Sequence, residues 1–253
     1  MNRIWFILVA SLLLLSCNKQ TPEKEVLPRT QKERVRWFEE ARLGIMIHWS
    51  LCTPAAGRFY GEKVRNSEYA EWIRCHNKVQ KADWDKMAKR MPISEKEIED
   101  WVIATKEGGF KYLTFVTKHH DGVAFWNSKV SDYTYGNLSG THFDVLKCLK
   151  EKCEKHGIVL CAYYSQWLDW GDMNGRNNDW DYADEQKTHF DRIAAGRGEI
   201  DAPYRQLPTE EAYDKYWREK AMPQVAELIK EYGVKLFWFD CWRADPVAEG
   251  QMT

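Results

Sequence analysis

Polar and titratable residues follow each of four short apolar runs in this sequence. His48 follows the first run, His119 and His120 the second, Tyr164 ends the third, and Asp240 follows the fourth. If each run is a strand of one parallel sheet, these side chains gather at the carboxyl-end edge of that sheet, where α/β folds place their sites. A single His or Asp at a strand end is more often structural, but four strand ends on one edge indicate a site. Histidine, tyrosine and carboxylate groups together suit a hydroxyl-rich ligand such as a sugar.

Asp240 is the residue that we expect to react. Trp238 lies two positions earlier, so both side chains emerge on the same side of a strand. An aspartate held beside a sugar ring by a tryptophan is a suitable nucleophile for a retaining displacement. Such a mechanism needs a second carboxyl about 5–5.5 Å from the first. Asp245 and Glu249 are too close in sequence to Asp240 for that role, so the acid/base carboxylate is expected to be missing from this chain.

Other chemistries fit the sequence less well. His119 and His120 are adjacent, so within a strand they would point to opposite faces, and no H-x-H or zinc-type spacing occurs. The acidic loop that begins at Asp172 lacks the spacing and the final Glu of a calcium loop. No G-x-S-x-G elbow is present, and Cys241 has no paired base nearby in the sequence. We therefore expect no metal and no cofactor.

The four apolar runs have the pattern of buried parallel strands. They are continuous rather than alternating, which is typical of strands covered on both faces, and they span Leu43–Ile47, Tyr112–Val116, Ile158–Tyr164 and Val234–Phe239. Each of the last three follows a helical pattern that stops at glycine. The first helix is expected to begin at a capping box, Ser94–Glu97, and to run to Gly108. The second is expected over Phe143–His156 and the third over Glu210–Tyr232, where Pro223 would kink or divide the helix. Repeated helix, glycine and strand predict βα units and a parallel sheet.

The lengths of the connections favour a barrel. Helix-to-strand turns are short, whereas long connections follow the strands, over Trp49–Ile93, His119–Thr141 and Ser165–Thr209. A (β/α)8 barrel carries its site on such loops. A doubly wound sheet also fits four parallel strands, but no Gly-rich phosphate loop follows any of them. We expect an α/β fold of the (β/α)8-like (TIM) barrel type over residues 34–253, truncated after the fourth strand, because the 13 residues after Asp240 cannot supply four more units.

The first residues read as a targeting segment. The apolar run Ile4–Leu15 is too short to span a bilayer and has the length of a signal-peptide core. It leads into Leu14-Leu15-Ser16-Cys17, which resembles the lipobox of bacterial lipoproteins. We expect a signal peptide over residues 1–17, lipidation of Cys17, a polar tether over 18–33, and an exported lipoprotein that faces the periplasm or the cell surface. An ordinary secretory signal with an incidental cysteine is the alternative.

Composition narrows the class of ligand. With 37 basic and 38 acidic residues dispersed along the chain, no basic stripe suited to nucleic acid is present. The 13 Trp, 12 Tyr and 10 Phe suit both a core and the flat faces of sugars. Disulfides are permitted in an exported protein, but no CxxC pair occurs. Cys148, Cys153 and Cys161 lie in predicted helix or strand, so buried free thiols are expected. Nothing in the sequence indicates a protein partner.

From about residue 34 to residue 243 the sequence resembles the α-L-fucosidases of glycoside hydrolase family 29. The motifs that carry the resemblance occur in the family's order: Trp37-Phe38, Leu43 to Trp49, Glu71-Trp72, Lys118-His119-His120-Asp121-Gly122, Tyr163-Tyr164-Ser165 and Trp238-Phe239-Asp240. The resemblance implies a (β/α)8-like catalytic domain, usually followed by a β-sandwich that this chain lacks. It also implies a retaining, metal-free mechanism that releases terminal α-L-fucose from fucosylated glycans.

The resemblance also implies roles for individual residues. Asp240 would attack the anomeric carbon, and Cys241 stands after it where relatives commonly have Gly. The remaining residues would contact the sugar. Hydrogen bonds to it would come from His48, His119, His120 and Tyr164. Glu71 and Trp72 would close the pocket, and Trp238 would pack against the sugar ring. Two functions stay open, an exo-acting retaining α-L-fucosidase and a truncated, non-hydrolytic fucose-binding remnant. Because half a barrel has unpaired sheet edges, we expect residues 18–253 alone to express poorly or aggregate.

Overall fold

The computed structural model describes residues 30–65, 69–166, 168–175, 181, 190–192 and 206–240. The chain divides into two units, Met1–Glu40 and Ala41–Thr253. In the first unit, helix α1 (Gln31–Ala41) begins with a reciprocal cap, since Thr30 N donates to Glu33 Oε2 at 2.7 Å and Glu33 N donates to Thr30 Oγ1 at 3.3 Å. Cys17 and most of the expected tether lie outside the described residues. In the part of the chain that the structure describes, no helix has the length and apolarity needed to cross a membrane.

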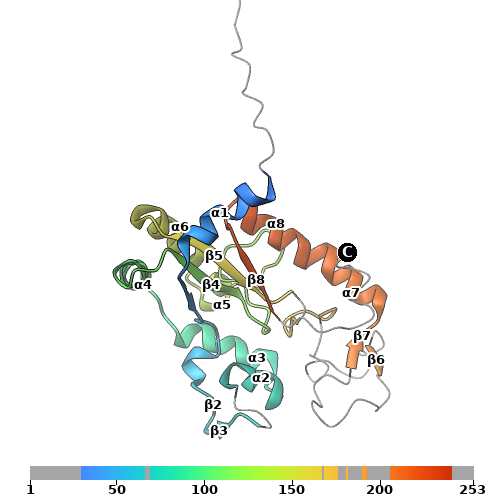
Figure 1. The fold of residues 1–253 in the computed structure, drawn as a ribbon. Helices are drawn as coiled ribbons and strands as arrows, with labels where there is room; N and C mark the ends of the chain where they lie inside the picture. The colour runs from blue at the N-terminus through green and yellow to red at the C-terminus, as the bar shows by residue number, and fades with distance from the viewer. Residues whose placement is uncertain are drawn as a thin grey trace, which may run out of the picture. The chain divides into compact units, whose positions relative to one another are not determined.

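The second unit is built around a four-stranded parallel sheet. Its strands are β1 (Gly44–Ile47), β4 (Tyr112–Lys118), β5 (Val159–Tyr164) and β8 (Phe237–Phe239), in the order β1-β4-β5-β8. Figure 1 shows these strands side by side. The predicted parallel sheet and α/β class are therefore confirmed. The fourth strand is shorter than predicted, although the residues before it still bond to β5, with Ala162 N donating to Leu236 O at 2.9 Å.

The helices that precede the strands begin and end near the predicted positions. The capping box at Ser94 opens α4 (Glu95–Glu107), and Gly157 ends α6 (Val145–His156) with φ of 72°. The third predicted helix is divided into α7 (Glu210–Tyr216), the π-helix η7 (Trp217–Ala221) and α8 (Met222–Lys230). Pro223 is the second residue of α8, directly after the π-helical turn, so the helix is divided next to the proline, as predicted.

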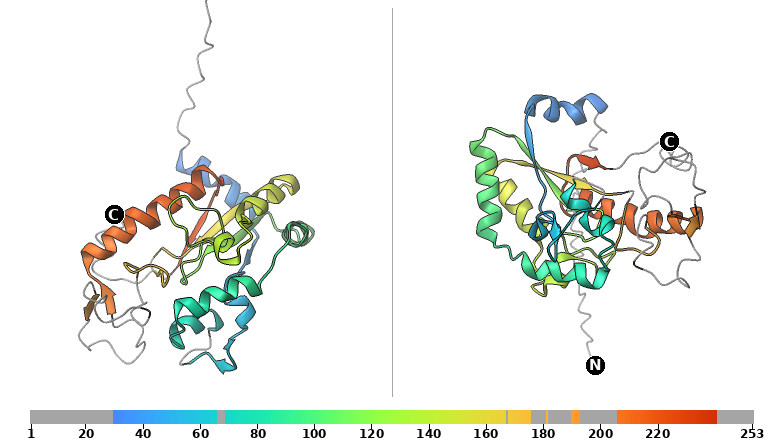
Figure 2. Two further views of the ribbon diagram at one scale, coloured as in Figure 1. Left: turned by 180° about the vertical axis from the view of Figure 1, so that it is seen from behind. Right: turned by 90° about the horizontal axis from the view of Figure 1, so that it is seen from below.

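One face of the sheet forms the core with these helices. The residues that meet there are fully or nearly fully buried and include Leu113, Phe115, Leu160 and Ala162 from the strands and Ile98, Val102, Leu146, Leu149 and Leu228 from the helices. Figure 2 shows from behind the helices that cover this side of the strands. Because side chains alternate along a strand, the neighbours of these residues point to the other face, among them Thr114, Cys161 and Tyr163.

Long connections follow the carboxyl ends of the strands, as predicted. After β1 come short elements: η1 (Thr53–Ala55), β2 (Arg58–Phe59), β3 (Glu62–Lys63), η2 (Ala70–Trp72), α2 (Ile73–His76), α3 (Lys81–Trp84) and η3 (Asp85–Arg90). Helix α5 (Tyr135–Ser139) follows β4, and the antiparallel pair β6 (Phe190–Arg192) and β7 (Gln206–Pro208) follows β5. Cys148, Cys153 and Cys161 are buried free thiols, which confirms that prediction; Cys241 lies outside the described residues.

Candidate active site

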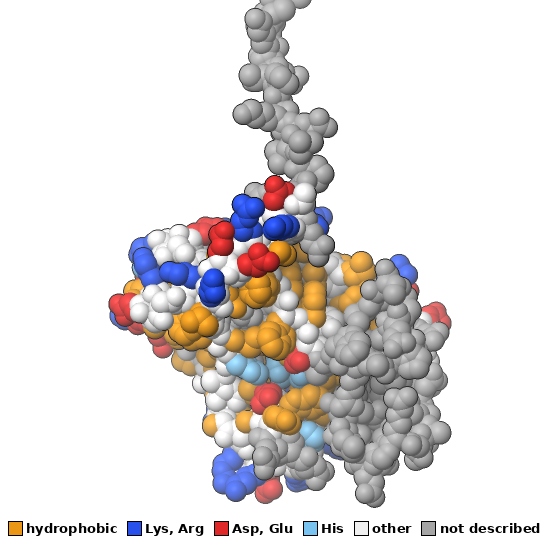
Figure 3. Space-filling model, viewed as in Figure 1, with side chains coloured by type: hydrophobic (Ala, Val, Ile, Leu, Met, Phe, Trp, Pro, Cys, Tyr) orange, Lys and Arg blue, Asp and Glu red, His pale blue; other side chains and the backbone are white. Residues whose placement is uncertain are grey.

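The carboxyl ends of the four strands bring His48, His119, His120, Tyr163 and Asp240 together. Tyr163 OH donates a hydrogen bond to Asp240 Oδ2 at 2.5 Å, and His120 Nε2 lies 3.6 Å from the same oxygen. The ring of His119 lies 4.7 Å from that of His48 and 5.8 Å from that of Tyr163, centroid to centroid. Figure 3 shows histidine and acidic side chains gathered among hydrophobic ones on this face. Three segments distant in sequence thus approach the carboxylate of a fourth.

His119 and His120 lie past the end of β4, and this changes where their rings point. The register with β5 shifts between Val116 and Lys118, and the chain then turns, with Gly122 N donating to His119 O at 3.0 Å. The two rings are 4.1 Å apart and tilted by 39°. The two rings therefore lie next to each other, because the chain leaves the extended strand before His119 and the expected alternation applies only within a strand. Among the described residues, no three His, Cys, Asp or Glu side chains converge as metal ligands would.

Burial keeps His119 and His120 neutral at ordinary pH. His119 and His120 are 3 % and 1 % exposed. Desolvation lowers the pKa of His119 well below its usual value, and the nearby His120 and His48 act in the same direction. Desolvation also lowers the pKa of His120, to about 3, against the opposing pull of the Asp240 carboxylate. The pKa of His48 is lowered by partial desolvation, while Glu71 and Asp240 act to raise it. The site therefore offers neutral imidazoles that hydrogen-bond, rather than a cluster of cations.

Glu71 and Trp72 come to the site from the connection after β1. Both are half-buried in η2, and Glu71 is near enough to act electrostatically on His48. The Trp72 ring lies edge-on to the His120 ring, with centroids 5.0 Å apart. It also meets Trp170, 5.4 Å away, which comes from the connection after β5 and is fully buried. Sequence reasoning missed Trp170; its only signal is an aromatic residue in a long loop after a strand.

Trp238 lies on the same side of the sheet as the site. In the register of β5 and β8 it pairs with Tyr163, and paired residues of parallel strands point the same way. Its side chain is 56 % exposed. An exposed indole beside Asp240 is a surface on which a flat ligand can pack.

Tyr164, by contrast, lies on the helix-covered face, away from Asp240. It is fully buried, its OH donates to Gln224 Oε1 at 2.8 Å, and Lys118 Nζ lies 4.4 Å above its ring. Because neighbours alternate along β5, Tyr163 is the residue that faces the site. The structure therefore puts Tyr163, and not the predicted Tyr164, beside the carboxylate. The run is apolar on both faces, so its pattern does not tell the two tyrosines apart.

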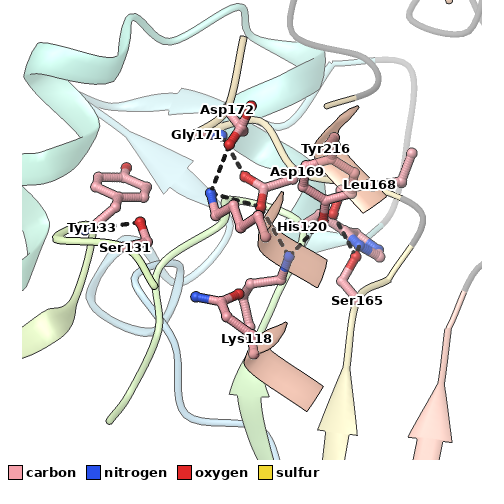
Figure 4. Close-up of polar contacts among 12 residues, drawn as sticks. Lys118, His120, Ser131, Tyr133, Ser165, Leu168, Asp169, Gly171, Asp172 and Tyr216 are labelled. Carbon is pink, nitrogen blue, oxygen red and sulfur yellow. Dashed lines mark hydrogen bonds and ion pairs between the residues drawn. The ribbon is translucent and has the colours of Figure 1, made fainter. Parts of the chain in front are cut away.

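A buried ion cluster underlies the histidines (Figure 4). Asp169 Oδ2 accepts from Lys118 Nζ at 2.9 Å and from Lys220 Nζ at 3.0 Å. Lys220 also lies 3.3 Å from Asp172, and Lys118 donates to Tyr216 OH at 2.8 Å. Although burial alone would raise it, the two ammonium groups hold the pKa of Asp169 well below its ordinary value. The cluster ties β4 and η7 to the loop after β5, and neither Asp169 nor Lys220 was expected from the sequence.

A parallel α/β sheet with neutral imidazoles, a tyrosine and a carboxylate on its carboxyl edge defines a ligand-binding or catalytic α/β protein of the kind whose sites lie on strand-end loops. Comparison with known proteins identifies the family of this chain. The family model described as Alpha-L-fucosidase matches residues 12–253. The chain belongs to the alpha-L-fucosidase family.

Curated relatives share about a quarter of the aligned residues. Human plasma alpha-L-fucosidase is 22 % identical over 209 residues, which cover 81 % of this chain and 38 % of the relative. Bovine tissue alpha-L-fucosidase is 24 % identical over 213 residues, with the same two shares. The chain therefore spans well under half the length of these relatives.

Solved structures agree with this assignment. Alpha-L-fucosidase AlfC from Lactobacillus casei, in complex with alpha-L-fucose, superposes with a TM-score of 0.67 at 30 % identity, over 87 % of this chain and 65 % of AlfC. A GH29 alpha-L-fucosidase from Bacteroides thetaiotaomicron gives a TM-score of 0.64 at 27 % identity, over 84 % and 41 % of the two chains. AlfC variants have also been solved with Fuca(1,6)GlcNAc and with 4-nitrophenyl-a-L-fucopyranoside.

Proposed function

We propose that this chain carries the sugar-binding half and the nucleophile of a retaining, exo-acting α-L-fucosidase. The observation that carries the proposal is the position of Asp240, whose Oδ2 accepts from Tyr163 OH at 2.5 Å and lies 3.6 Å from His120 Nε2. A carboxylate that attacks an anomeric carbon must be held in one orientation. The hydrogen bond from Tyr163 OH holds the Asp240 carboxylate in place.

The surrounding groups suit a fucose ring. His48, His119 and His120 offer neutral nitrogens to its hydroxyls, and Trp238 offers an exposed ring face beside Asp240. Glu71 and Trp72 close the site from the connection after β1. The family's solved complexes with fucosides favour terminal α-L-fucose on a glycan as the substrate.

The proposed fold is a (β/α)8 barrel of which the four parallel strands form part. Short turns enter the strands and long connections leave them, and every site residue lies at the carboxyl end of a strand or in the connection that follows one, which is the arrangement of such barrels. A retaining mechanism needs a second carboxyl about 5–5.5 Å from the nucleophile. We assign no residue of this chain to that acid/base role.

Covalent trapping tests the nucleophile. Incubation of the full-length gene product with a 2-fluoro-fucosyl donor should label Asp240, because the fluorine slows hydrolysis of the glycosyl-enzyme more than its formation. Asp240→Ala should lose turnover of 4-nitrophenyl α-L-fucoside, whereas Asp214→Ala, which removes an exposed carboxylate paired with Arg218, should keep it. A label on another residue, or full activity in Asp240→Ala, overturns the assignment. Binding of L-fucose by calorimetry without any turnover supports the non-hydrolytic remnant instead.

For localisation we propose an exported lipoprotein anchored through Cys17, on the basis of the apolar run and lipobox-like residues of the N-terminus. Expression in a bacterium fed with a labelled fatty acid tests it. The chain should incorporate label and partition into detergent, and Cys17→Ser should do neither. If the processed chain carries no fatty-acid label and is released from the membrane, an ordinary secretory signal is supported instead.

A further inference from the structure

Ser165 lies directly behind His120, on the side away from Asp240. The hydroxyl is fully buried and its Oγ lies 2.8 Å from His120 Nδ1. The same Oγ donates to the backbone carbonyl of Leu168, also at 2.8 Å. Figure 4 shows these contacts, which meet at the Ser165 hydroxyl.

The Leu168 carbonyl determines where the protons of the Ser165 hydroxyl and the His120 ring lie. A carbonyl oxygen can only accept, so the single hydroxyl proton of Ser165 is committed to it. The Ser165 oxygen must then accept from His120, and Nδ1 must bear a hydrogen. In a neutral imidazole one nitrogen donates and the other accepts, so Nε2 becomes the acceptor, 3.6 Å from Asp240 Oδ2. We infer that Ser165 is a positioning residue that fixes His120 as the Nδ1–H tautomer and thereby presents Nε2 as an acceptor beside Asp240.

The loop that supplies the carbonyl is held from several sides. Leu168 precedes Asp169, which the ammonium groups of Lys118 and Lys220 contact at 2.9 and 3.0 Å. Trp170 N donates to His120 O at 2.7 Å, so this loop also holds the histidine's own backbone. The ion cluster therefore fixes both ends of the hydrogen-bonded chain that runs from Leu168 through Ser165 to His120. Burial, which lowers the pKa of His120, keeps the ring neutral so that the tautomer matters.

The tautomer determines what the site can accept. With Nε2 as an acceptor, His120 does not donate a proton to the Asp240 carboxylate and so does not reduce its nucleophilicity. The imidazole nitrogen and the carboxylate oxygen together form a pair of acceptors, which suits a ligand hydroxyl that donates. This consequence rests on the proposed function, in which the ligand is a sugar; the tautomer itself does not.

Nitrogen-15 spectroscopy of the unliganded full chain tests the tautomer without any assay of activity. Long-range proton–nitrogen correlations distinguish a protonated from a bare ring nitrogen, and comparison with His120→Gln assigns the signals among the seven histidines. We expect a protonated Nδ1 and a bare Nε2 near neutral pH. A protonated Nε2, in the neutral or the charged ring, overturns the inference whatever the protein's activity.

Substitution of Ser165 tests its part. Ser165→Ala should shift the nitrogen signals of His120 toward the other tautomer and lower kcat/KM for 4-nitrophenyl α-L-fucoside about tenfold or more, the scale of one lost hydrogen bond. Ser165→Thr keeps the hydroxyl and should keep the wild-type tautomer, and the control Ser139→Ala should change neither quantity. An unchanged tautomer in folded Ser165→Ala overturns the inference. The expected tautomer in a protein without fucosidase activity would leave the inference standing and remove the proposed function.

Discussion

Asp169→Asn is the substitution that best separates buried from surface electrostatics in this protein. The change keeps the shape of the side chain and removes its charge. Asp169 is fully buried, and its Oδ2 is shared by Lys118 and Lys220 at 2.9 and 3.0 Å. The variant thus leaves two buried ammonium groups without their common counter-ion.

The expected cost follows from what each lysine retains. Removing one member of a buried ion pair costs about 3–5 kcal/mol, because the other charge stays buried and uncompensated. Lys220 keeps Asp172 at 3.3 Å, and Lys118 keeps Tyr216 OH at 2.8 Å, so the loss is moderated on both sides. We therefore expect about 3 kcal/mol. For a unit of this size that is a fall in Tm of roughly 6–12 °C.

The matched control is Asp100→Asn, the same chemical change in an exposed pair. Lys96 and Asp100 lie 2.6 Å apart with side chains 82 % and 53 % exposed, so water screens their interaction and the pair contributes little to stability. Both variants are compared with the wild-type chain by urea unfolding followed by circular dichroism. In the Asp169→Asn background, Lys118→Met should recover stability rather than lose more. If Asp169→Asn and Asp100→Asn fall within about 1 kcal/mol of each other, the reasoning from buried charge is refuted.

Two further predictions concern the tyrosines of β5 and the buried Asp121. Tyr163→Phe removes the hydrogen-bond donor to Asp240 and should lower kcat for an aryl fucoside about tenfold with little change in Tm. Tyr164→Phe should cost about 1 kcal/mol of stability and leave kcat near wild type. Equal effects of the two substitutions on kcat would contradict the opposite orientations of the two side chains. Burial raises the pKa of Asp121 to about 6, against the hydrogen bonds from Val123 N and Trp84 Nε1 and the charge of Arg74. The folded state then binds the proton more tightly than the unfolded chain, so this contribution is complete below about pH 4 and is lost as pH rises through about 6. Asp121→Asn should reduce the fall in the free energy of unfolding, measured with urea, between pH 4 and pH 7. If the substitution leaves this pH dependence unchanged, other groups cause it.

The elements of the fold could be predicted because local signals agree with tertiary packing. The Ser94 capping box and the glycine stop at Gly157 set helix ends through backbone geometry that depends on neighbours in sequence. Continuous apolar runs mark all four strands, but of these only β4 and β5 are buried on both faces, whereas Met46 in β1 and Phe239 in β8 are 41 % and 46 % exposed. The same continuity hides which face each residue takes, and it is why Tyr163 and Tyr164 could not be distinguished.

The contacts that hold the site could not be predicted, since they join residues far apart in the chain. Lys118 and Asp169 are 51 positions apart, and Lys118 and Tyr216 are 98 apart. No periodicity relates them, and only the register of β4 with β5 and the path of the later loop bring them together. The sequence therefore predicts that the strand ends carry the site, but not which buried partners fix its side chains.

The run from Lys118 to Gly122 shows why a short motif can be so specific. Lys118 turns into the ion cluster, His119 and His120 turn to the site, and Asp121 accepts from Val123 N at 3.1 Å and from Trp84 Nε1 at 3.2 Å. Gly122 has φ of +85°, and a Cβ there would lie 2.0 Å from Asp169 Oδ1, so no other residue fits. Asp169 is thus both the counter-ion of Lys118 and the neighbour that requires glycine. The five residues are constrained by four different surroundings that meet at one loop, and a change at any of them would disturb the histidines through the backbone that they share.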